Sequence, residues 1–596
     1  MADPSDGGAA AVLEYTHIIA IDFGTSGSGI AVWNNFLKET FVYSRWNRRN
    51  VGVVCKCPSV LLLDHEGKLE KFGFDAEKFY QSKRGLEHPK RADEYYLFKH
   101  FKMCLYEETN ILRSMTVEAV NEKKLPALDV FAKSLDYLKQ EITGWLDNQL
   151  SATYRRIQWI LTVPAIWSPG AKQMMREAAK KAGLGIEDNS SLELVLEPEA
   201  AAMFCQKELL SISTSQDSTV QSKPVHYLVA DCGGGTLDMA AHKMTKSVDG
   251  KITIEEIHQA HGGPFGGFAV NIEFEKLLKG LFQLTSEHIK KIKKQHSRQW
   301  TKLVYDDFEN SKCSSSIYKD ITLDIHRNIL KEVEAITQKN ITKLVEEYKL
   351  HKVEWDEDEG LVLPFVTIYN LFLPVITQII RAIDQVLQKP ECQCIEKILL
   401  VGGFAECKLL LDEVRKTFSP SKDVKLSSSP QLAVLRGAVI YGLQKDTIKS
   451  RKMRQSIGIE TWDDFIPGFH DETKKMKKNG KDFCINIFTK FVDINESVPI
   501  EKNIEHVFTP TSKDQDTCKI SIIGSHSPKA LYIDEDCCYD IGVLTVTNLP
   551  KYDSGVSREV KVVINVSGTE VTVSAYCNGT YQKLPAKLDF FKDKYV

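Results

Sequence analysis

Hydrophobic and polar positions alternate in two different ways along the chain. From Tyr15 to about Gly442, short apolar runs are separated by longer stretches of helical periodicity, a pattern typical of α/β folds. Four runs are rich in β-branched and other apolar residues and are followed at once by a turn of small residues, so we expect buried strands there. They lie at residues 17–21, 158–163, 225–230 and 397–401.

Helix signals are clearest after the second of these runs. Ser168 is a good side-chain cap, Pro169 stands at the first helical position, and Gly183 follows two lysines and an alanine. These residues predict a helix that begins at Pro169 and stops before Gly183. Residues 365–387 carry apolar side chains at helical spacing despite Pro374, and they predict a longer helix.

The pattern changes after about residue 443. Residues 444–455 are polar and basic, which favours a linker, whereas residues 1–14 have the composition of a flexible tail. Residues 456–596 contain short alternating segments separated by turn residues, which predicts a β-sandwich. The segments lie at residues 485–492, 518–524, 541–546, 559–566 and 570–575.

Composition narrows the class of protein. The chain of 596 residues is 43% hydrophobic and 26% charged, which is too apolar for a largely disordered protein. The formal net charge of -3 gives no bulk attraction to nucleic acid, so we expect no nucleic-acid partner. We expect no membrane span, because no window approaches 18 uninterrupted apolar residues. The 14 cysteines lack the spacing of zinc or redox motifs, which predicts reduced thiols in a cytoplasmic protein.

Two glycine-rich turns carry the strongest chemical signal. Each follows an apolar run that delivers an aspartate, and each places a threonine beside the glycines, whose exposed amides can form a nest for phosphate. Two opposed turns can clamp a polyphosphate, with Asp22 and Asp231 holding the waters of Mg²⁺. The first turn comprises Asp22, Gly24, Thr25, Ser26 and Gly27; the second comprises Asp231, Gly233, Gly234, Gly235, Thr236 and Asp238.

Three further features fit the same cleft. Gly266 and Gly267 form a third glycine turn, before a helix expected to begin near Asn271. Glu197 is fixed by Pro198 just before a helix, where a carboxylate can orient or deprotonate water, or simply favour the helix N-terminus. A fourth turn follows another apolar run and comprises Gly402, Gly403 and Phe404.

These motifs resemble the markers of the 70-kDa heat-shock proteins, and the chain is most similar to the divergent 70 kDa protein 12 subfamily. The markers begin at Asp22, Thr162, Glu197, Asp231 and Val401. The resemblance implies a two-lobed actin-like ATPase domain with a duplicated ribonuclease-H-like core over residues 15–443. Its second lobe would begin at about residue 225, and a smaller β-sandwich would follow the linker.

The resemblance also implies roles for particular residues. Thr25, Ser26 and residues 233–236 would contact the phosphates of ATP or ADP, and Asp238 matches the same motif. Glu197 would lie near the attacking water, with a catalytic lysine that we assign to Lys102, Lys99 being the alternative. Gly266 and Gly267 would lie beside the nucleotide. The residues implied on the adenosine side are Glu309, Lys312, Ser316, Gly402 and Gly403.

The chain departs from the family at several of these positions. Cys313 and Glu406 replace arginines, Phe404 replaces a serine, and Gln431 replaces an aspartate. By stacking on adenine, Phe404 could compensate for the lost arginines. The loss of cation–π partners predicts weaker nucleotide binding. Residues 445–455 lack the leucine-rich run that docks in the family, and we expect neither the helical lid nor the acidic cochaperone-binding tail.

We therefore predict an atypical chaperone or regulatory protein that binds ATP and Mg²⁺ and hydrolyses ATP slowly, with nucleotide state setting the angle between lobes. Residues 456–596 are the candidate surface for protein clients or cochaperones. One alternative is a nucleotide-responsive scaffold with little or no turnover. Another is a small-molecule kinase of the same superfamily, although the added β-sandwich supplies no substrate pocket between the lobes.

Overall fold

A computed structural model gives a mixed α/β protein, as the hydrophobic pattern predicts. It describes residues 15–46, 54–82, 95–107, 110–148, 156–186, 190–210, 223–313, 318–478, 480–500, 502–510, 512, 514–551, 558–566, 568–578 and 582–593. The predicted tail at residues 1–14 lies outside these ranges.

The first large sheet is built around the first predicted strand. Its path runs β11-β10-β1-β2-β3, in which β10 and β11 run parallel to β1 and the hairpin strands β2 and β3 follow antiparallel. The strands are β1 (His17–Phe23), β2 (Gly27–Asn34), β3 (Glu39–Val42), β10 (Ile157–Val163) and β11 (Ser190–Leu196), and β4 (Cys57–Pro58) pairs with β2.

The second large sheet repeats this arrangement. Its path begins β19-β18-β12-β13-β14, again with two parallel strands on one side of the first strand and an antiparallel meander on the other. These strands are β12 (Val225–Cys232), β13 (Leu237–Lys246), β14 (Ile252–Gly263), β18 (Lys397–Val401) and β19 (Asp423–Leu426). Equal strand order and direction place the two glycine turns at equivalent ends of β1 and β12.

Two helices pack between the sheets. Helices α6 (Glu197–Phe204) and α16 (Ala433–Leu443) share an apolar core with β1 and β12. They approach closely because α16 carries Gly437, where a Cβ atom would overlap the carbonyl oxygen of Ala200. This buried core joins the two sheets.

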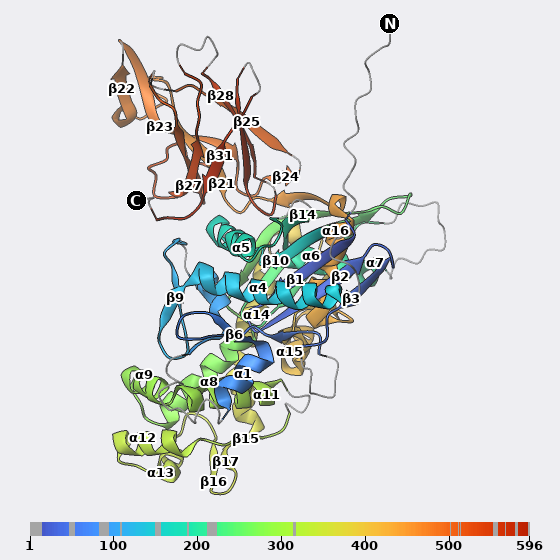
Figure 1. Cartoon of the computed structure of the whole chain (residues 1–596), viewed down its shortest axis with the longest axis vertical. Helices are drawn as coiled ribbons and strands as arrows, with labels where there is room; N and C mark the ends of the chain where they lie inside the picture. Colours follow the sequence, from blue (N-terminus) through green and yellow to red (C-terminus); the bar gives the residue numbers. More distant parts are fainter. Residues whose placement is uncertain are drawn as a thin grey trace.

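The outer faces of the sheets have separate cores. The first is covered by α4 (Ala127–Asp147) and α5 (Pro169–Lys181), and the second by α8 (Gly267–Leu281) and α14 (Phe365–Leu387). As predicted, Ser168 caps α5, Pro169 is its first residue, and Gly183 has the positive φ of 82° that ends such helices. Smaller elements are α1 (Gly73–Gln81) and, at the far end in Figure 1, α9 (Ser286–Gln295), α12 (Arg327–Thr337), α13 (Ile341–Glu347), β15 (Ile321–Leu323), β16 (Glu354–Asp356) and β17 (Gly360–Leu363).

Helix α14 is, among the described residues, the one helix long and apolar enough to cross a membrane. Its buried face includes Ile368, Phe372 and Ile379, which belong to the core of the second sheet. These contacts account for its apolar composition as a core helix.

The C-terminal part contains two antiparallel sheets that share one apolar core. The larger follows the path β22-β23-β21-β26-β27-β31, and the smaller follows β25-β28-β29-β30. The strands are β21 (Ser456–Asp464), β22 (Lys475–Lys478), β23 (Lys481–Val492), β25 (Asn503–Phe508), β26 (Cys518–Ser525), β27 (Cys538–Val546), β28 (Val560–Asn565), β29 (Thr572–Cys577), β30 (Lys583–Leu584) and β31 (Ala586–Asp589). All five segments predicted from alternation are strands here. Figure 1 shows these sheets at one end of the molecule, beside α5.

The segment expected to be a linker is partly a strand. Strand β20 (Ile448–Lys452) pairs parallel with β14, and β24 (Ser497–Pro499) pairs with β20, so both extend the second large sheet. Arg451 is buried and its guanidinium forms two hydrogen bonds of 2.6 and 2.7 Å with Glu199 on α6. A buried ion pair therefore anchors this segment, which lacks the leucine-rich run of the family.

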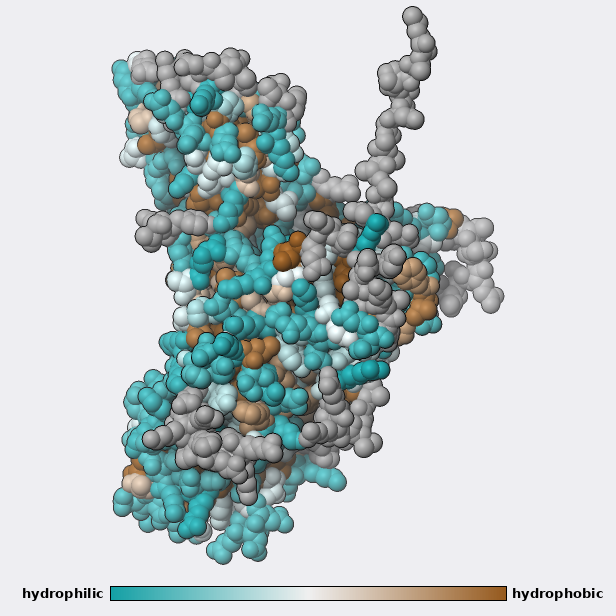
Figure 2. All heavy atoms as spheres, in the orientation of Figure 1, coloured by the Kyte–Doolittle hydropathy of each residue, from teal (hydrophilic) through white to brown (hydrophobic). Residues whose placement is uncertain are grey.

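The face of the molecule in Figure 2 is mainly polar, as expected for a chain with 26% charged residues. Figure 2 shows a largely hydrophilic face on which apolar side chains occur in small groups. None of the 14 cysteines forms a disulfide, and most are wholly or partly buried.

Candidate functional site

The two predicted glycine turns meet face to face. A Cβ atom on Gly234 would overlap the side chain of Ser26, and one on Gly235 would overlap Thr25 and Met103. In the second turn the Gly233 amide donates to the carbonyl of Thr236 at 2.9 Å, which closes the loop. Any side chain at Gly234 or Gly235 would therefore fill the space between the turns.

The third glycine turn lies directly on the second. The amides of Gly266, Gly267 and Phe268 donate to the carbonyls of Gly235, Gly233 and Gly234 at 3.1, 3.1 and 2.7 Å. These bonds start α8 at Gly267, four residues earlier than the sequence pattern predicts. The reason is tertiary, because the second turn supplies the carbonyls that hold the first helical turn in place.

Three buried carboxylates gather where the turns meet. Asp22 accepts a hydrogen bond from Thr162 at 3.1 Å and forms an ion pair with Lys56 at 2.6 Å. Burial raises the pKa of Asp231 well above its usual value, and the negative charges of Glu197 and Asp22 raise it further. Gly402, with φ of 87°, packs its backbone against Asp231, where a Cβ atom would overlap the carboxylate. The cluster is thus short of positive charge.

Glu197 is held by the lysine that the sequence favours. Lys102 donates to its Oε1 at 2.9 Å, and the same ammonium lies 5.0 Å from the centre of the Trp167 ring. Burial raises the pKa of Glu197 even though Lys102 opposes the shift. The alternative, Lys99, instead pairs with Glu77 and Asp306 at 2.8 Å each, away from Glu197.

The predicted adenosine side is compact. Lys312 is buried and donates to the carbonyl of Gly267 at 2.8 Å, to Asn271 at 2.6 Å and to Glu309 at 2.5 Å. Phe404 is also buried: it lies against Gly267, and its ring centre is 6.2 Å from that of Phe372. Its place in this apolar contact leaves the expected stacking on adenine without support. Gly403 lies near Gln431, and Ser316 lies outside the described residues.

Two further members of the predicted set make contacts within the protein. The Asp238 carboxylate accepts a hydrogen bond from the amide of Ala165, and its other oxygen is buried without a hydrogen bond. Burial, followed by the charge of Glu197, raises the pKa of Asp238 to about 7. Gly27 begins β2, where it pairs with Pro58. Their predicted roles toward a nucleotide stay predictions.

The sequence is similar to those of known heat-shock proteins. No family model matches the chain. Mouse heat shock 70 kDa protein 12A is 29% identical over 96% of this chain and 91% of its own length. Human heat shock 70 kDa protein 12B is 28% identical over 97% and 92%, respectively. DnaK of Carsonella ruddii is 22% identical over 93% and 81%.

The chain is a homologue of the heat shock 70 kDa protein 12 proteins. The resemblance inferred from the motifs is confirmed over nearly the whole length, and DnaK is a more distant relative. These homologues imply an actin-like ATPase fold, and the equal strand order of the two large sheets agrees with it.

Two of the departures from the wider heat-shock family are neighbours in the structure. Gln431 donates to the carboxylate of Glu406 at 2.6 Å, and both side chains are exposed. The two replacements are therefore compatible, because the neutral amide of Gln431 can donate to the carboxylate of Glu406. Cys313, the third departure, contacts Glu309 at 3.4 Å.

Sequence reasoning missed two residues of the cleft. Lys56 reaches Asp22 because β4 pairs with the beginning of β2. No local sequence pattern predicts that pairing. His100, next to the lysines, stacks on Phe268 with ring centres 4.1 Å apart and joins the first part of the chain to α8. The sequence gives no signal for this contact; the positive φ of 54° at His100 is visible only in the structure.

Proposed function

We propose that this protein binds ATP or ADP with Mg²⁺ between two actin-like lobes, one around each large sheet, and hydrolyses ATP slowly. The observation that carries the proposal is the meeting of the two glycine turns above buried Asp22, Asp231 and Glu197. Each turn offers backbone amides, and the space between them excludes even a Cβ atom on Gly234. The exposed amides of turns that carry no side chain favour an anionic phosphate group.

The charge of the cleft fits a hydrated divalent cation. Burial and the negative charges of Glu197 and Asp22 raise the pKa of Asp231, and the nearby cations are Lys56 and Lys102. Mg²⁺ prefers carboxylate oxygens and keeps several of its waters, so Asp22 and Asp231 would hold it through water. Bound Mg-ATP would supply a polarised terminal phosphate.

Glu197 is the residue best placed to act on an attacking water. Burial raises the pKa of Glu197, which makes its carboxylate a stronger proton acceptor, and Lys102 fixes the direction of that carboxylate. The pairing also restrains Glu197, which is consistent with slow turnover. Positioning and electrostatics, which Glu197 and Lys102 supply together, are the main demands of phosphoryl transfer.

The C-terminal sheets are proposed to form a β-sandwich that binds protein clients or cochaperones in the cytoplasm. The end of β21 exposes Trp462, and the segment that follows it exposes Ile466 and Phe469; the three residues are 48%, 54% and 66% accessible. Exposed large apolar side chains favour contact with an extended apolar peptide.

Isothermal titration of ATP and ADP with Mg²⁺ tests the cleft. Wild-type protein is expected to bind both, and Gly234→Asp to bind neither, because its carboxylate would lie between the phosphate turns. Gly144→Asp is the matched control, since a side chain there meets no atom within 4 Å. Absence of binding by wild type would refute the proposal.

Single-turnover phosphate release then separates the chaperone-like ATPase from the scaffold. Release that depends on Glu197 supports hydrolysis at this site. Nucleotide binding with no release dependent on Glu197 would favour the scaffold, in which the nucleotide is a structural ligand. The pairing of Glu197 with Lys102 makes that outcome physically reasonable.

A further inference from the structure

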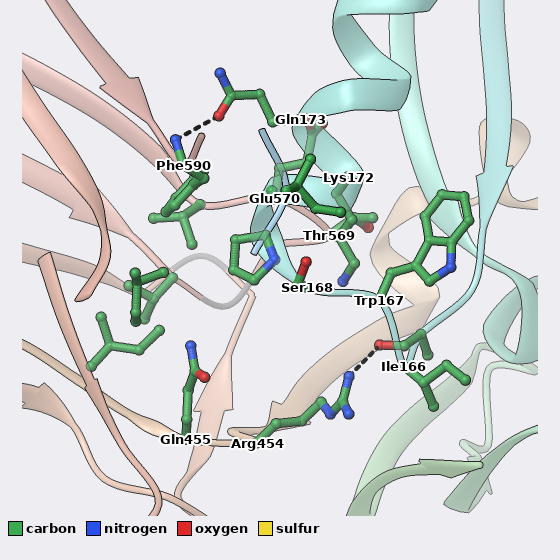
Figure 3. A pocket seen from close by; sticks show the side chains of 18 of the residues that line it. Ile166, Trp167, Ser168, Lys172, Gln173, Arg454, Gln455, Thr569, Glu570 and Phe590 are labelled. Atoms are coloured by element: carbon green, nitrogen blue, oxygen red, sulfur yellow. Dashed lines mark hydrogen bonds between the residues drawn. The ribbon is translucent and has the colours of Figure 1, made fainter. Parts of the chain in front are cut away.

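A second cavity lies between α5, the β20–β21 segment and the C-terminal sheets. It has a volume of about 960 Å³, within the range of small-molecule sites. Apolar walls come from residues including Met453, Ile457 and Ile541, and Trp167 and Phe590 add aromatic surface. Figure 3 shows the side chains that line it and the two hydrogen bonds at its edges.

Polar contacts join the parts of the chain around this cavity. Gln173 on α5 accepts from the amide of Phe590 at 2.7 Å, and Arg176 forms an ion pair with Glu570. Arg451 is matched in the same way by Glu199 at the back. Specific contacts thus hold together the parts of the chain that line the cavity.

Two cations in the cavity are not matched. Within the described residues, Lys172 on the first turn of α5 forms no ion pair or side-chain hydrogen bond, and Arg454 donates only to the carbonyl of Ala165, at 3.2 Å. Figure 3 shows the Lys172 ammonium and the Arg454 side chain reaching in from opposite sides. Burial and the charges of Arg454 and Arg451 lower the pKa of Lys172 to about 8.

Asp238, on the far side of Ala165, attracts both cations without forming an ion pair with either, and the carboxylates that line the cavity are paired, exposed or neutral. Glu570 and Glu177 are paired with Arg176 and Arg113, and Glu107 and Asp540 are exposed at the rim. Glu256 is buried, and burial raises its pKa to about 8, so it is mainly neutral at pH 7. Lys172 is half-buried and Arg454 is exposed at the cavity, and their like charges repel, so an anion between them would be favourable.

We propose that this cavity binds a small organic anion whose carboxylate or phosphate group lies between Lys172 and Arg454. A planar guanidinium and an ammonium together suit either oxyanion. The apolar and aromatic walls suit a ligand with a hydrophobic body. The site is separate from the glycine turns and independent of nucleotide binding there.

Calorimetric titration with phenyl phosphate and benzoate tests the proposal, with benzyl alcohol as the neutral probe. Wild-type protein is expected to bind at least one of the two anions and to ignore benzyl alcohol. Lys172→Gln and Arg454→Gln are each expected to weaken binding about tenfold or more. Lys181→Gln, which removes a charge from the same helix outside the cavity, and Gly234→Asp are expected to leave it unchanged.

Several results would overturn the proposal. One is the absence of binding by both anions at millimolar concentration. Another is binding that survives Lys172→Gln and Arg454→Gln. Binding lost in Gly234→Asp alone would place the anion in the glycine turns.

Stability gives a second readout that a purely structural lysine would not produce. Without ligand, Lys172→Gln removes repulsion with Arg454 and is expected to raise the thermal midpoint, whereas Lys172→Arg should retain both anion binding and the wild-type midpoint. A fall in midpoint for Lys172→Gln would contradict the uncompensated charge on which the site is based.

Discussion

The cleft at the glycine turns and the cavity beside α5 are opposite in charge. The cleft gathers Asp22, Asp231 and Glu197 with too few cations, whereas the cavity gathers Lys172 and Arg454, which form no ion pair among the described residues. Only the peptide at Ala165 separates them, because its amide donates to Asp238 and its carbonyl accepts from Arg454. Each imbalance is reasonable if a ligand of opposite charge completes the site.

Between these two sites lies a pair of charges that is complete. Arg451 and Glu199 are 6% and 2% exposed, and each satisfies the other through two hydrogen bonds. A buried charge therefore does not by itself indicate a ligand site. What distinguishes the cleft and the cavity is that the protein leaves part of the charge unmatched.

The largest effect is expected when the cleft loses its water-directing carboxylate. Glu197→Gln should slow single-turnover release of phosphate by about 10²- to 10⁴-fold, because the amide cannot accept a proton. ATP affinity should change little. Glu177→Gln, outside the cleft, is the control, and unchanged release in Glu197→Gln would remove the residue from the reaction.

Breaking the complete pair should be the largest effect on stability. Arg451→Met leaves Glu199 buried without its cation and is expected to lower the free energy of unfolding by about 3–5 kcal/mol. Urea unfolding measures the change. Lys445→Met removes the cation of an exposed ion pair with Glu193 and should cost less than about 1 kcal/mol. Equal losses for the two variants would contradict the assigned burial.

Excess carboxylate should make the nucleotide-free protein less stable as the pH rises. Asp238 has a pKa of about 7 in the folded state, above the value of about 3.9 for an unfolded aspartate. The folded state therefore binds more protons between these values, and stability falls by at most about 1.4 kcal/mol per pH unit from this group.

Asp238→Asn should remove this contribution and raise stability at pH 7.5 relative to wild type. Thermal melts from pH 4.5 to 7.5 compare the slopes. Asp249, which is exposed on a turn, provides the matched Asp→Asn control. An unchanged slope in Asp238→Asn would show that this carboxyl does not hold an extra proton.

The smallest effect concerns the adenosine side. Cys313→Arg restores the residue type of the wider family and is expected to tighten ATP binding by about two- to fivefold, through a cation–π contact of about 0.5–1 kcal/mol. Titration calorimetry can resolve that change. Cys394→Arg, on an exposed residue of another segment, controls for added charge.

Local signals identified the elements that carry their own boundaries. The cap at Ser168, the proline at its first turn and the stop at Gly183 define α5, and the apolar period defines α14 with its interior Pro374. The four buried strands and the alternating C-terminal strands were visible for the same reason, since burial on one or both faces imposes a pattern on neighbouring residues. Elements whose boundaries depend on distant partners were missed or displaced, such as β20 and the start of α8.

The sequence by itself determined the α/β architecture, the glycine turns with their aspartates, and the family relationship, because each resides in residues adjacent along the chain. Tertiary structure alone decided that Lys102 rather than Lys99 meets Glu197, that Lys56 joins Asp22, and that Asp238 turns toward Ala165. It also brought Lys172 and Arg454 to one cavity. These pairings join residues far apart in the chain, and electrostatic energy depends on separation in space, which local sequence patterns do not encode.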